Sequence, residues 1–351
     1  MARKIPLYRR IRSLIDDLEP SLQEAFLKSV SDLRNQIVLK QVVEALEARD
    51  VDRAIRALNI DRAAFSPLRR AVEQAYGAGG EATIAAMPVL RDKTGARVVV
   101  RFDVADPRAE AQIARHAGKL ITGIVDDTIV VARNTILDGF SQGAHPHRIG
   151  LDLAGRISRA TGRREGGAIG MTSPQAEAAQ NLRDRLLSGD PAEMRKVLGM
   201  GLRDKRFDRT IIKAIEEGKP VAADMVSKMQ GRYADNAVKL RGRTIARTET
   251  GNAVMAAKHE AFRQGLEKSG YTEQAVTRKW RSAGDGKVRH SHQEMNGQTV
   301  RGLSAPFVSP VTGARMMHPL DTSLGAGAED VVACRCDEEI NIDFFEGRGD
   351  G

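Results

Sequence analysis

Polar side chains of the kinds that bind metals or perform catalysis are concentrated in the last third of this chain. They form short motifs with little apolar sequence around them: Arg247-Thr248-Glu249, Asp285, His290 and His292, Asn296-Gly297, His318-Pro319 and Cys334-Arg335-Cys336. Histidine and cysteine are the ligands that zinc prefers in proteins. Two opposite interpretations follow: a catalytic or metal centre, or an unusually polar structural module.

A long helix is expected to carry the first of these motifs. Helical sequence begins near Pro220, and Gly270 is expected to end it. Arg247 and Glu249 do not share a face of this helix. Small side chains recur at three- and four-residue spacing and predict a face that allows close backbone approach: Ala246, Thr250, Ala253, Ala257 and Ala261.

The remaining motifs are expected on strands and turns. We predict strands at Ala275–Trp280 and at Val331–Asp337, the second of which carries both cysteines. Asp285-Gly286 predicts a turn, and Asn296-Gly297 predicts another with the positive φ of a tight hairpin. Trp280 is the only tryptophan and is expected to anchor the core, because its ring can bury a large apolar area.

The sequence before residue 240 is mostly helical in pattern. The segment Gly77–Gly80 breaks this pattern and is the first candidate linker. The apolar-rich segment Arg97–Val104 follows a turn and predicts a strand or hairpin. The expected fold class is therefore α+β, with a mainly helical N-terminal region and a compact mixed α/β C-terminal domain. The predicted segments are a helical region at 1–80, a β-hairpin or strand connector at 81–106, a helical region at 107–239, the compact domain at 240–342 and a flexible tail at 343–351.

Composition limits the classes of protein that fit. The 351 residues are enough for two or more domains, and 41% hydrophobic content supports real cores. Cys334 and Cys336 are the only cysteines, and residues two apart on a strand lie too far from each other for an easy disulfide, which indicates a reducing compartment. We find neither a signal-peptide core nor an apolar stretch of membrane-spanning length, so we expect a protein made and assembled inside a cell without a membrane partner.

The charge is distributed unevenly along the chain. Residues 251–351 hold 12 Lys and Arg against 14 Asp and Glu, whereas residues 1–250 hold 43 against 32. A basic region can neutralise phosphates, which favours weak, nonspecific contact with DNA. The basic runs are interleaved with acidic residues, so solvated helix faces laced with ion pairs are the competing interpretation.

The order of the C-terminal motifs resembles that of a known family. The chain has ARTETGNA from Ala246, Trp280 with Asp285 five residues later, VRHSHQEMNGQ from Val288, FVSPVTG from Phe307 with a following His-Pro, and finally CRC from Cys334. These strings resemble the C-terminal domain of the phage Mu F-like minor head proteins, also called phage head morphogenesis proteins. The resemblance covers residues 240–342, and residues 107–240 resemble less distinctively the helical region that precedes this domain.

The resemblance implies a structural role rather than an enzymatic one. Proteins of this family are minor components of the heads of tailed bacteriophages or prophages. The expected partners are the portal protein and the major capsid or scaffold protein, with nonspecific contact to packaged DNA. The expected place is the capsid interior or the portal vertex, after assembly in the host cytoplasm, with a role in head morphogenesis and in genome packaging or ejection.

The chain departs from the family pattern where a metal would bind. Many members have paired cysteines ahead of the His-Pro and Cys-Arg-Cys elements, a set suited to tetrahedral zinc. Arg289 and His292 occupy the places of the first pair here. The ligands that remain for a structural zinc are His292, His318, Cys334 and Cys336, with His290 as a spare.

The competing interpretation is a polar network without a metal. In it Glu249, Asp285 and Arg289 exchange charge-assisted hydrogen bonds that hold the loops together. The structural motif would then comprise Arg247, Glu249, Trp280, Asp285, Arg289, Asn296 and Gly297.

An enzymatic alternative rests on the two neighbouring histidines. His290 and His292, followed by Asn296, superficially resemble metal-dependent nucleases, in which one histidine activates water and another binds a divalent ion. A DNA-processing phage enzyme would also suit a basic protein. Against it, Asn296-Gly297 is better explained as a turn, and we predict no catalytic residues.

Overall fold

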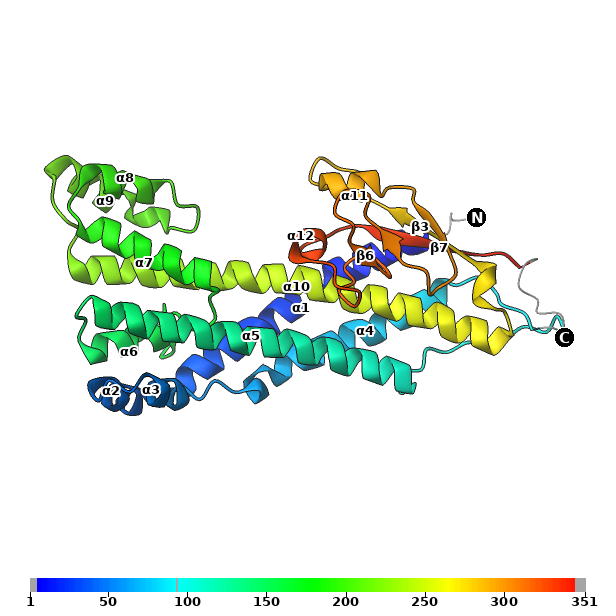
Figure 1. The fold of residues 1–351 in the computed structure, drawn as a ribbon, viewed down its shortest axis with the longest axis horizontal. Coiled ribbons are helices and arrows are strands. Elements are labelled where there is room, and N and C mark those ends of the chain that lie inside the picture. Colours follow the sequence, from blue (N-terminus) through cyan, green and yellow to red (C-terminus); the bar gives the residue numbers. More distant parts are fainter. Residues whose placement is uncertain (1–4, 93, 345–351) are drawn as a thin grey trace. The chain divides into compact units, whose positions relative to one another are not determined.

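The computed structural model describes residues 5–92 and 94–344, and helices dominate them (Figure 1). Together with small antiparallel sheets near the C-terminus, they confirm the predicted α+β class. The chain divides into two compact units: unit 1 comprises Met1–Gln23, Arg69–Ala117 and Arg243–Gly351, and unit 2 comprises Glu24–Leu68 and Gly118–Gly242. Most of the tail predicted at 343–351 lies outside the described residues.

Four long helices contribute to both units. They are α1 (Leu7–Gln36), α4 (Ser66–Ala86), α5 (Pro107–Ser141) and α10 (Ala223–Ser269). Apolar residues at helical spacing form the buried stripe of α1, among them Ile11, Ile15, Leu22 and Phe26. Within the described part of the chain, no helix is both long and apolar enough to cross a membrane.

Unit 2 consists mainly of helices. Its shorter helices are α2 (Leu39–Glu47), α3 (Val51–Ala57), α6 (Pro146–Ala154), α7 (Ser173–Leu187), α8 (Pro191–Leu198) and α9 (Asp208–Glu217), with a small hairpin of β1 (Arg156–Ile157) and β2 (Arg164–Glu165). An apolar core lies among α1, α2, α3, α5 and α6, and Leu33, Leu46, Ile136, Leu153 and Ile169 belong to it. The buried Arg34 guanidinium donates to the carbonyls of Gly167 and Ile169 and pairs with Asp235 at 3.1 Å, so backbone groups of a loop are satisfied without water.

The glycines predicted to form a linker lie inside helix α4 instead. A Cβ added to Gly79 would lie 2.9 Å from the Cα of Val254 on α10, and one added to Gly80 would lie 2.1 Å from the ring of Phe102. These glycines therefore allow close approach of neighbouring groups within unit 1. The linker interpretation of Gly77–Gly80 was wrong because helix packing outweighs the low helix propensity of glycine.

The strand predicted at Arg97–Val104 is also absent from the described residues. Only an isolated bridge joins Arg91 to Arg97. Further along, the backbone of Asp103 makes its hydrogen bonds with a side chain: Gln264 on α10 accepts from the Asp103 amide at 2.9 Å and donates to its carbonyl at 3.0 Å. The Gln264 side chain thus makes the backbone hydrogen bonds that a neighbouring strand would make if this segment were part of a sheet.

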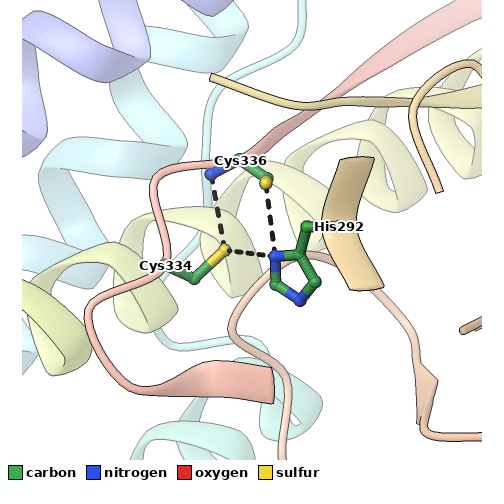
Figure 2. Close-up of side chains that lie close together, drawn as sticks. All are labelled: His292, Cys334 and Cys336. Carbon is green, nitrogen blue, oxygen red and sulfur yellow. Dashed lines mark hydrogen bonds between the residues drawn. The ribbon is translucent and has the colours of Figure 1, made fainter. Parts of the chain in front are cut away.

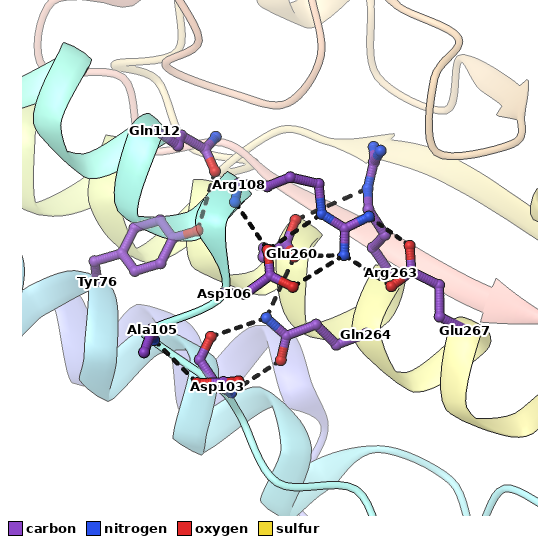
Figure 3. Close-up of polar contacts among 10 residues, drawn as sticks. All are labelled: Tyr76, Asp103, Ala105, Asp106, Arg108, Gln112, Glu260, Arg263, Gln264 and Glu267. Atoms are coloured by element: carbon purple, nitrogen blue, oxygen red, sulfur yellow. Dashed lines mark hydrogen bonds and ion pairs between the residues drawn. The ribbon is translucent and has the colours of Figure 1, made fainter.

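The same region holds α10 through a polar clasp, which we define as Asp103, Asp106, Arg108, Glu260, Gln264 and Glu267 (Figure 3). The guanidinium of Arg108 lies between Asp106 at 3.3 Å and Glu267, and 3.5 Å from Glu260. Burial raises the pKa of Glu260. The clasp fixes the start of α5 to α10 within unit 1.

The C-terminal part of unit 1 contains a three-stranded antiparallel sheet. The central strand β3 (Val276–Arg281) pairs with β4 (Thr299–Arg301) and with β7 (Asp337–Ile342). Every second residue of β3 is buried, so Val276, Arg278 and Trp280 face the interior. The predicted strand at Ala275–Trp280 is confirmed, and Trp280 is fully buried as expected.

The loops around this sheet carry the shorter elements. They are α11 (His290–Glu294), α12 (Ala328–Val331) and a two-stranded ribbon of β5 (Phe307–Val308) and β6 (Arg315–Met316). The strand predicted at Val331–Asp337 was misplaced, since Val331 ends α12 and β7 begins only at Asp337. Ala333 has a φ of 53°, which breaks an extended backbone, and the two cysteines consequently lie in a loop.

Candidate metal centre

His292, Cys334 and Cys336 come together in a buried group just before the start of β7 (Figure 2). His292 lies on the short helix α11, and the two cysteines lie in the loop between α12 and β7. Their exposed fractions are only 1%, 5% and 4%. One ligand atom from each residue lies within 4.8 Å of the others, so the three side chains could hold one metal ion.

The His292 imidazole contacts the sulfur atoms of both cysteines. His292 Nδ1 lies 3.3 Å from Cys334 Sγ and 3.4 Å from Cys336 Sγ. The bend at Ala333 brings the sulfurs to the same ring atom, and the Cys336 amide donates to Cys334 Sγ at 3.4 Å. The two cysteines therefore converge on one point, which two residues on a straight strand would not do.

Hydrogen bonds favour the thiolate at one of the cysteines. The side chain of Cys336 donates to Cys334 and, together with the adjacent His292, lowers the pKa of the Cys334 thiol well below its ordinary value. The thiolate is the form of cysteine that binds metals. The group thus offers two sulfurs and an imidazole nitrogen at close range.

The separations fit a tetrahedral zinc ion. Zinc bonds of about 2.1 Å to nitrogen and about 2.3 Å to sulfur place the two ligand atoms about 3.5 Å apart in a tetrahedral site. The observed nitrogen–sulfur distances of 3.3 and 3.4 Å are close to this value. Zinc would supply a positive charge that compensates the thiolates and would fasten α11 to the final loop.

Two buried residues hold the imidazole in place. The Trp280 ring contacts the His292 ring edge-on, with centroids 5.3 Å apart. On the other side, Asp330 is fully buried and its Oδ1 lies 3.8 Å from His292 Nε2. The prediction from sequence included Trp280 as a core residue but missed Asp330, which offered only the weak signal of an acidic residue close to the cysteines.

The structure does not bring the fourth predicted ligand to this group. His318 packs instead near His259, with ring centroids 5.7 Å apart, and its Nδ1 lies 2.9 Å from the Pro319 carbonyl. The spare ligand His290 is exposed and lies 3.9 Å from Glu294. Among the described residues, the group that could hold a metal therefore has three members rather than the four expected.

The acidic and basic residues predicted to form one polar network do not meet one another. Asp285 makes two 2.6 Å contacts with Arg335, which lower its pKa to about 2. Arg289 donates to the Val332 carbonyl at 2.6 Å, and Glu249 lies 2.8 Å from His116. The proposed exchange among Glu249, Asp285 and Arg289 was wrong, because each finds a partner far away in sequence.

The other predicted motif residues have separate structural roles. Arg247 pairs with Asp16 at 2.8 Å and with Glu19, and so joins α10 to α1 within unit 1. The Asn296 side chain accepts from the Ser282 amide at 2.9 Å. Gly297 has the predicted positive φ, at 87°, but its turn follows α11 and does not form a two-residue hairpin.

A buried charge network lies beside this region and was missed from the sequence. The fully buried Arg278 pairs with Glu338 at 3.1 Å and donates to the carbonyls of Gly302 and Ala305. The buried Lys258 pairs with Asp337 at 2.7 Å. The one available signal was an arginine at an inward position of the predicted strand, between Val276 and Trp280.

His259 completes this network as a hydrogen-bond acceptor. Arg278 Nη1 lies 3.0 Å from His259 Nε2, so an N–H of the arginine points to the ring nitrogen. Burial and the neighbouring Arg278 charge hold the pKa of His259 well below 6.5. Burial raises the pKa of Glu338. The network joins α10, β3 and β7 in addition to the apolar cluster that includes Phe262 and Val276.

The fold and site define an α+β protein whose small sheet domain is held by buried charges and a His/Cys/Cys group. Residues 205–338 match the family model described as phage Mu protein F like protein, so this chain has a phage Mu F-like domain, as predicted. The match begins upstream of the predicted boundary at residue 240. The family is one of phage head morphogenesis, which implies a place in the virion. Searches of curated proteins and of solved structures found no match to this chain.

Proposed function

We propose that this protein is a structural minor head protein of a tailed bacteriophage or prophage, associated with the portal vertex on the inside of the capsid. The observation that carries this proposal is the phage Mu F-like match over residues 205–338. The proposed partners are the portal protein and the major capsid or scaffold protein.

Chemical cross-linking and mass spectrometry of purified proheads and mature heads test the structural role. We expect the chain in both particles, with cross-links from its lysines to the portal protein. Lys213, Lys219 and Lys228 are exposed and suit this chemistry. Absence of the chain from both kinds of particle would refute the proposal, and cross-links to coat protein alone would refute the portal assignment.

The uneven charge supports contact with packaged DNA. Residues 1–250 carry 43 Lys and Arg against 32 Asp and Glu. We expect weak binding to duplex DNA, equal for unrelated sequences, with an affinity that falls linearly with salt on logarithmic axes. Fluorescence anisotropy with two unrelated duplexes measures this. A strong preference for one duplex, or no binding at low salt, contradicts the proposal.

We further propose that the protein acts without nuclease chemistry. The two histidines that would share a nuclease site have different surroundings: His290 is exposed beside Glu294, whereas His292 is buried against the two cysteines. Incubation of supercoiled DNA with the protein and Mg²⁺, Mn²⁺ or Zn²⁺ should leave the DNA intact. Cleavage that a His290→Ala variant abolishes would establish the enzymatic alternative.

We also propose that His292, Cys334 and Cys336 bind zinc. The support is the burial of the three residues and the nitrogen–sulfur distances suited to tetrahedral coordination. Elemental analysis after purification without chelators should give close to one zinc per chain, lost in the Cys334→Ser variant and retained in His290→Ala. Zinc content near zero in the native protein would remove the proposal.

A further inference from the structure

A small cavity adjoins the His/Cys/Cys group. Its volume is about 20 Å³, and it is lined by His292, Cys334 and Cys336 together with Lys287 and Arg289. A cavity of this size holds roughly one water-sized group. The three ligand residues therefore border a space for one further small ligand.

Arg289, which lines this cavity, has an N–H group that makes no hydrogen bond within the described residues. Its Nη2 donates to the Val332 carbonyl at 2.6 Å, which fixes the guanidinium. Its Nη1 is buried and has no hydrogen-bond partner among the described residues. A buried donor without an acceptor costs about 1–3 kcal/mol, so the position favours a ligand that accepts a hydrogen bond.

Asp330 lies on the opposite side of the His292 imidazole from the two sulfurs. Its Oδ1 faces His292 Nε2 at 3.8 Å, and Ser291 Oγ lies 3.3 Å from the same carboxylate oxygen. A proton on Nε2, facing this carboxylate, leaves the Nδ1 lone pair directed at the sulfurs. Metal-binding histidines are oriented by carboxylates in this way.

We propose that this metal centre is open: His292, Cys334 and Cys336 are its only protein ligands, and its fourth position takes a small exogenous anion that Arg289 Nη1 holds. This inference rests on the proposed zinc and is independent of the proposed role in the phage head. Structural zinc sites are closed by four protein ligands, whereas sites with three protein ligands keep a replaceable position. The displacement of His318 from the group leaves that position free.

The charges around the site fit this ligand class. A zinc ion and two thiolates sum to zero, and a neutral imidazole adds nothing. Arg289 and Lys287 line the cavity, whereas no acidic residue is among its described lining residues, and the Asp330 carboxylate lies on the other nitrogen of the imidazole. A small anion completes the coordination and accepts the free hydrogen bond of Arg289.

Cadmium-substituted full-length protein tests the inference by NMR. We expect one cadmium per chain, in the His318→Ala variant as in the wild type, and a cadmium resonance that shifts with added bromide until saturation. The Arg289→Met variant should need about tenfold more bromide, the loss expected for a hydrogen bond to a charged group. The matched control is Arg315→Met, because Arg315 is exposed and does not line the cavity.

The outcomes separate this inference from the zinc proposal on which it rests. A resonance that stays fixed at all bromide concentrations shows a closed site, and loss of cadmium in His318→Ala shows a fourth protein ligand. Either result overturns the open centre and leaves zinc binding intact. Failure to bind any metal in the native protein overturns both. The bromide titration of the wild type needs no variant, so misfolding of Arg289→Met does not weaken the test.

Discussion

At the scale of single residues, this protein places charge where apolar side chains usually lie. Arg278 occupies an inward position on the central strand, and its charge is balanced by Glu338 on the neighbouring strand. Three backbone carbonyls of loops that lack regular structure accept its N–H groups. The domain also has an apolar core, in which the Phe307 ring centroid lies 5.0 Å from the Arg278 guanidinium carbon.

The pair between Arg278 and Glu338 predicts a large effect of a small substitution. Glu338→Gln leaves the Arg278 charge buried without its counter-ion and should lower the free energy of unfolding by about 3 kcal/mol. The control is Glu339→Gln, since Glu339 is the next residue of β7 and half-exposed, so its loss should change stability by less than about 1 kcal/mol. Urea denaturation measures both, and equal effects would show that the buried pair is dispensable.

His259 predicts a pH dependence of stability. Its pKa is held well below 6.5 in the folded protein by burial and by Arg278, whereas the unfolded chain has the ordinary value. As the pH falls through 6.5, His259 takes up a proton in the unfolded state but not in the folded state. The free energy of unfolding therefore decreases by up to about 1.4 kcal/mol per pH unit.

The His259→Gln variant should lose this decrease between neutral pH and about pH 5. Glu338, whose pKa is raised by burial, contributes with the opposite sign and is common to both proteins, so their difference isolates His259. The exposed His290 gives the control variant His290→Gln, with the wild-type dependence expected. Urea denaturation across this pH range measures the dependence. Parallel curves for His259→Gln and wild type would contradict the assignment.

At the scale of elements, helix α4 shows that close packing between helices can outweigh the low helix propensity of glycine. A run of glycines that predicts a break lies instead in the middle of this helix. The absence of a side chain at Gly79 lets α4 approach the backbone of α10 at Val254. The small-residue face predicted on α10 is consistent with this approach, since Ala253 and Ala257 are buried.

This contact predicts opposite effects for two glycines of one helix. Gly79→Ala puts a Cβ 2.9 Å from the Val254 backbone, which cannot rotate away, and should lower stability by about 1–3 kcal/mol. Gly77→Ala, whose nearest neighbour is Val104 at 3.9 Å, should raise stability by up to about 1 kcal/mol through helix propensity. Thermal unfolding measures both. Stabilisation by Gly79→Ala would show that the two helices can separate without cost.

At the scale of the whole molecule, the Mu F-like domain does not coincide with one of the compact units. The family match covers residues 205–338, whereas unit 1 combines residues from the beginning, the middle and the end of the chain. The polar clasp and the pairs of Arg247 both join α10 to segments that precede residue 118. The C-terminal residues therefore depend on the N-terminal ones for their packing.

A fragment of residues 240–344 tests this dependence. It retains the sheet and the His/Cys/Cys group but lacks α1, α4 and the start of α5, so the apolar and charged groups of α10 lose their partners. We expect no cooperative unfolding transition by circular dichroism, in contrast to the full chain. A fragment that unfolds as cooperatively as the full chain would show instead that the boundary predicted at residue 240 is a true domain boundary.

The sequence alone determined the class of fold, the family and the buried position of Trp280. These follow from local properties: helical spacing, strand alternation and the order of short motifs along the chain. It also indicated His292, Cys334 and Cys336 as candidate metal ligands, although it added His318 to them.

Only the tertiary structure decided which polar groups meet. Asp285 pairs with Arg335, and His292 faces Cys334, across separations in sequence that no local pattern encodes. The bend at Ala333 converts a predicted strand into the loop that directs both sulfurs to one nitrogen. Such contacts depend on the path of the whole chain. A buried charge is stable only beside a group of opposite charge or a hydrogen-bond partner, and the tertiary structure decides which groups lie beside it.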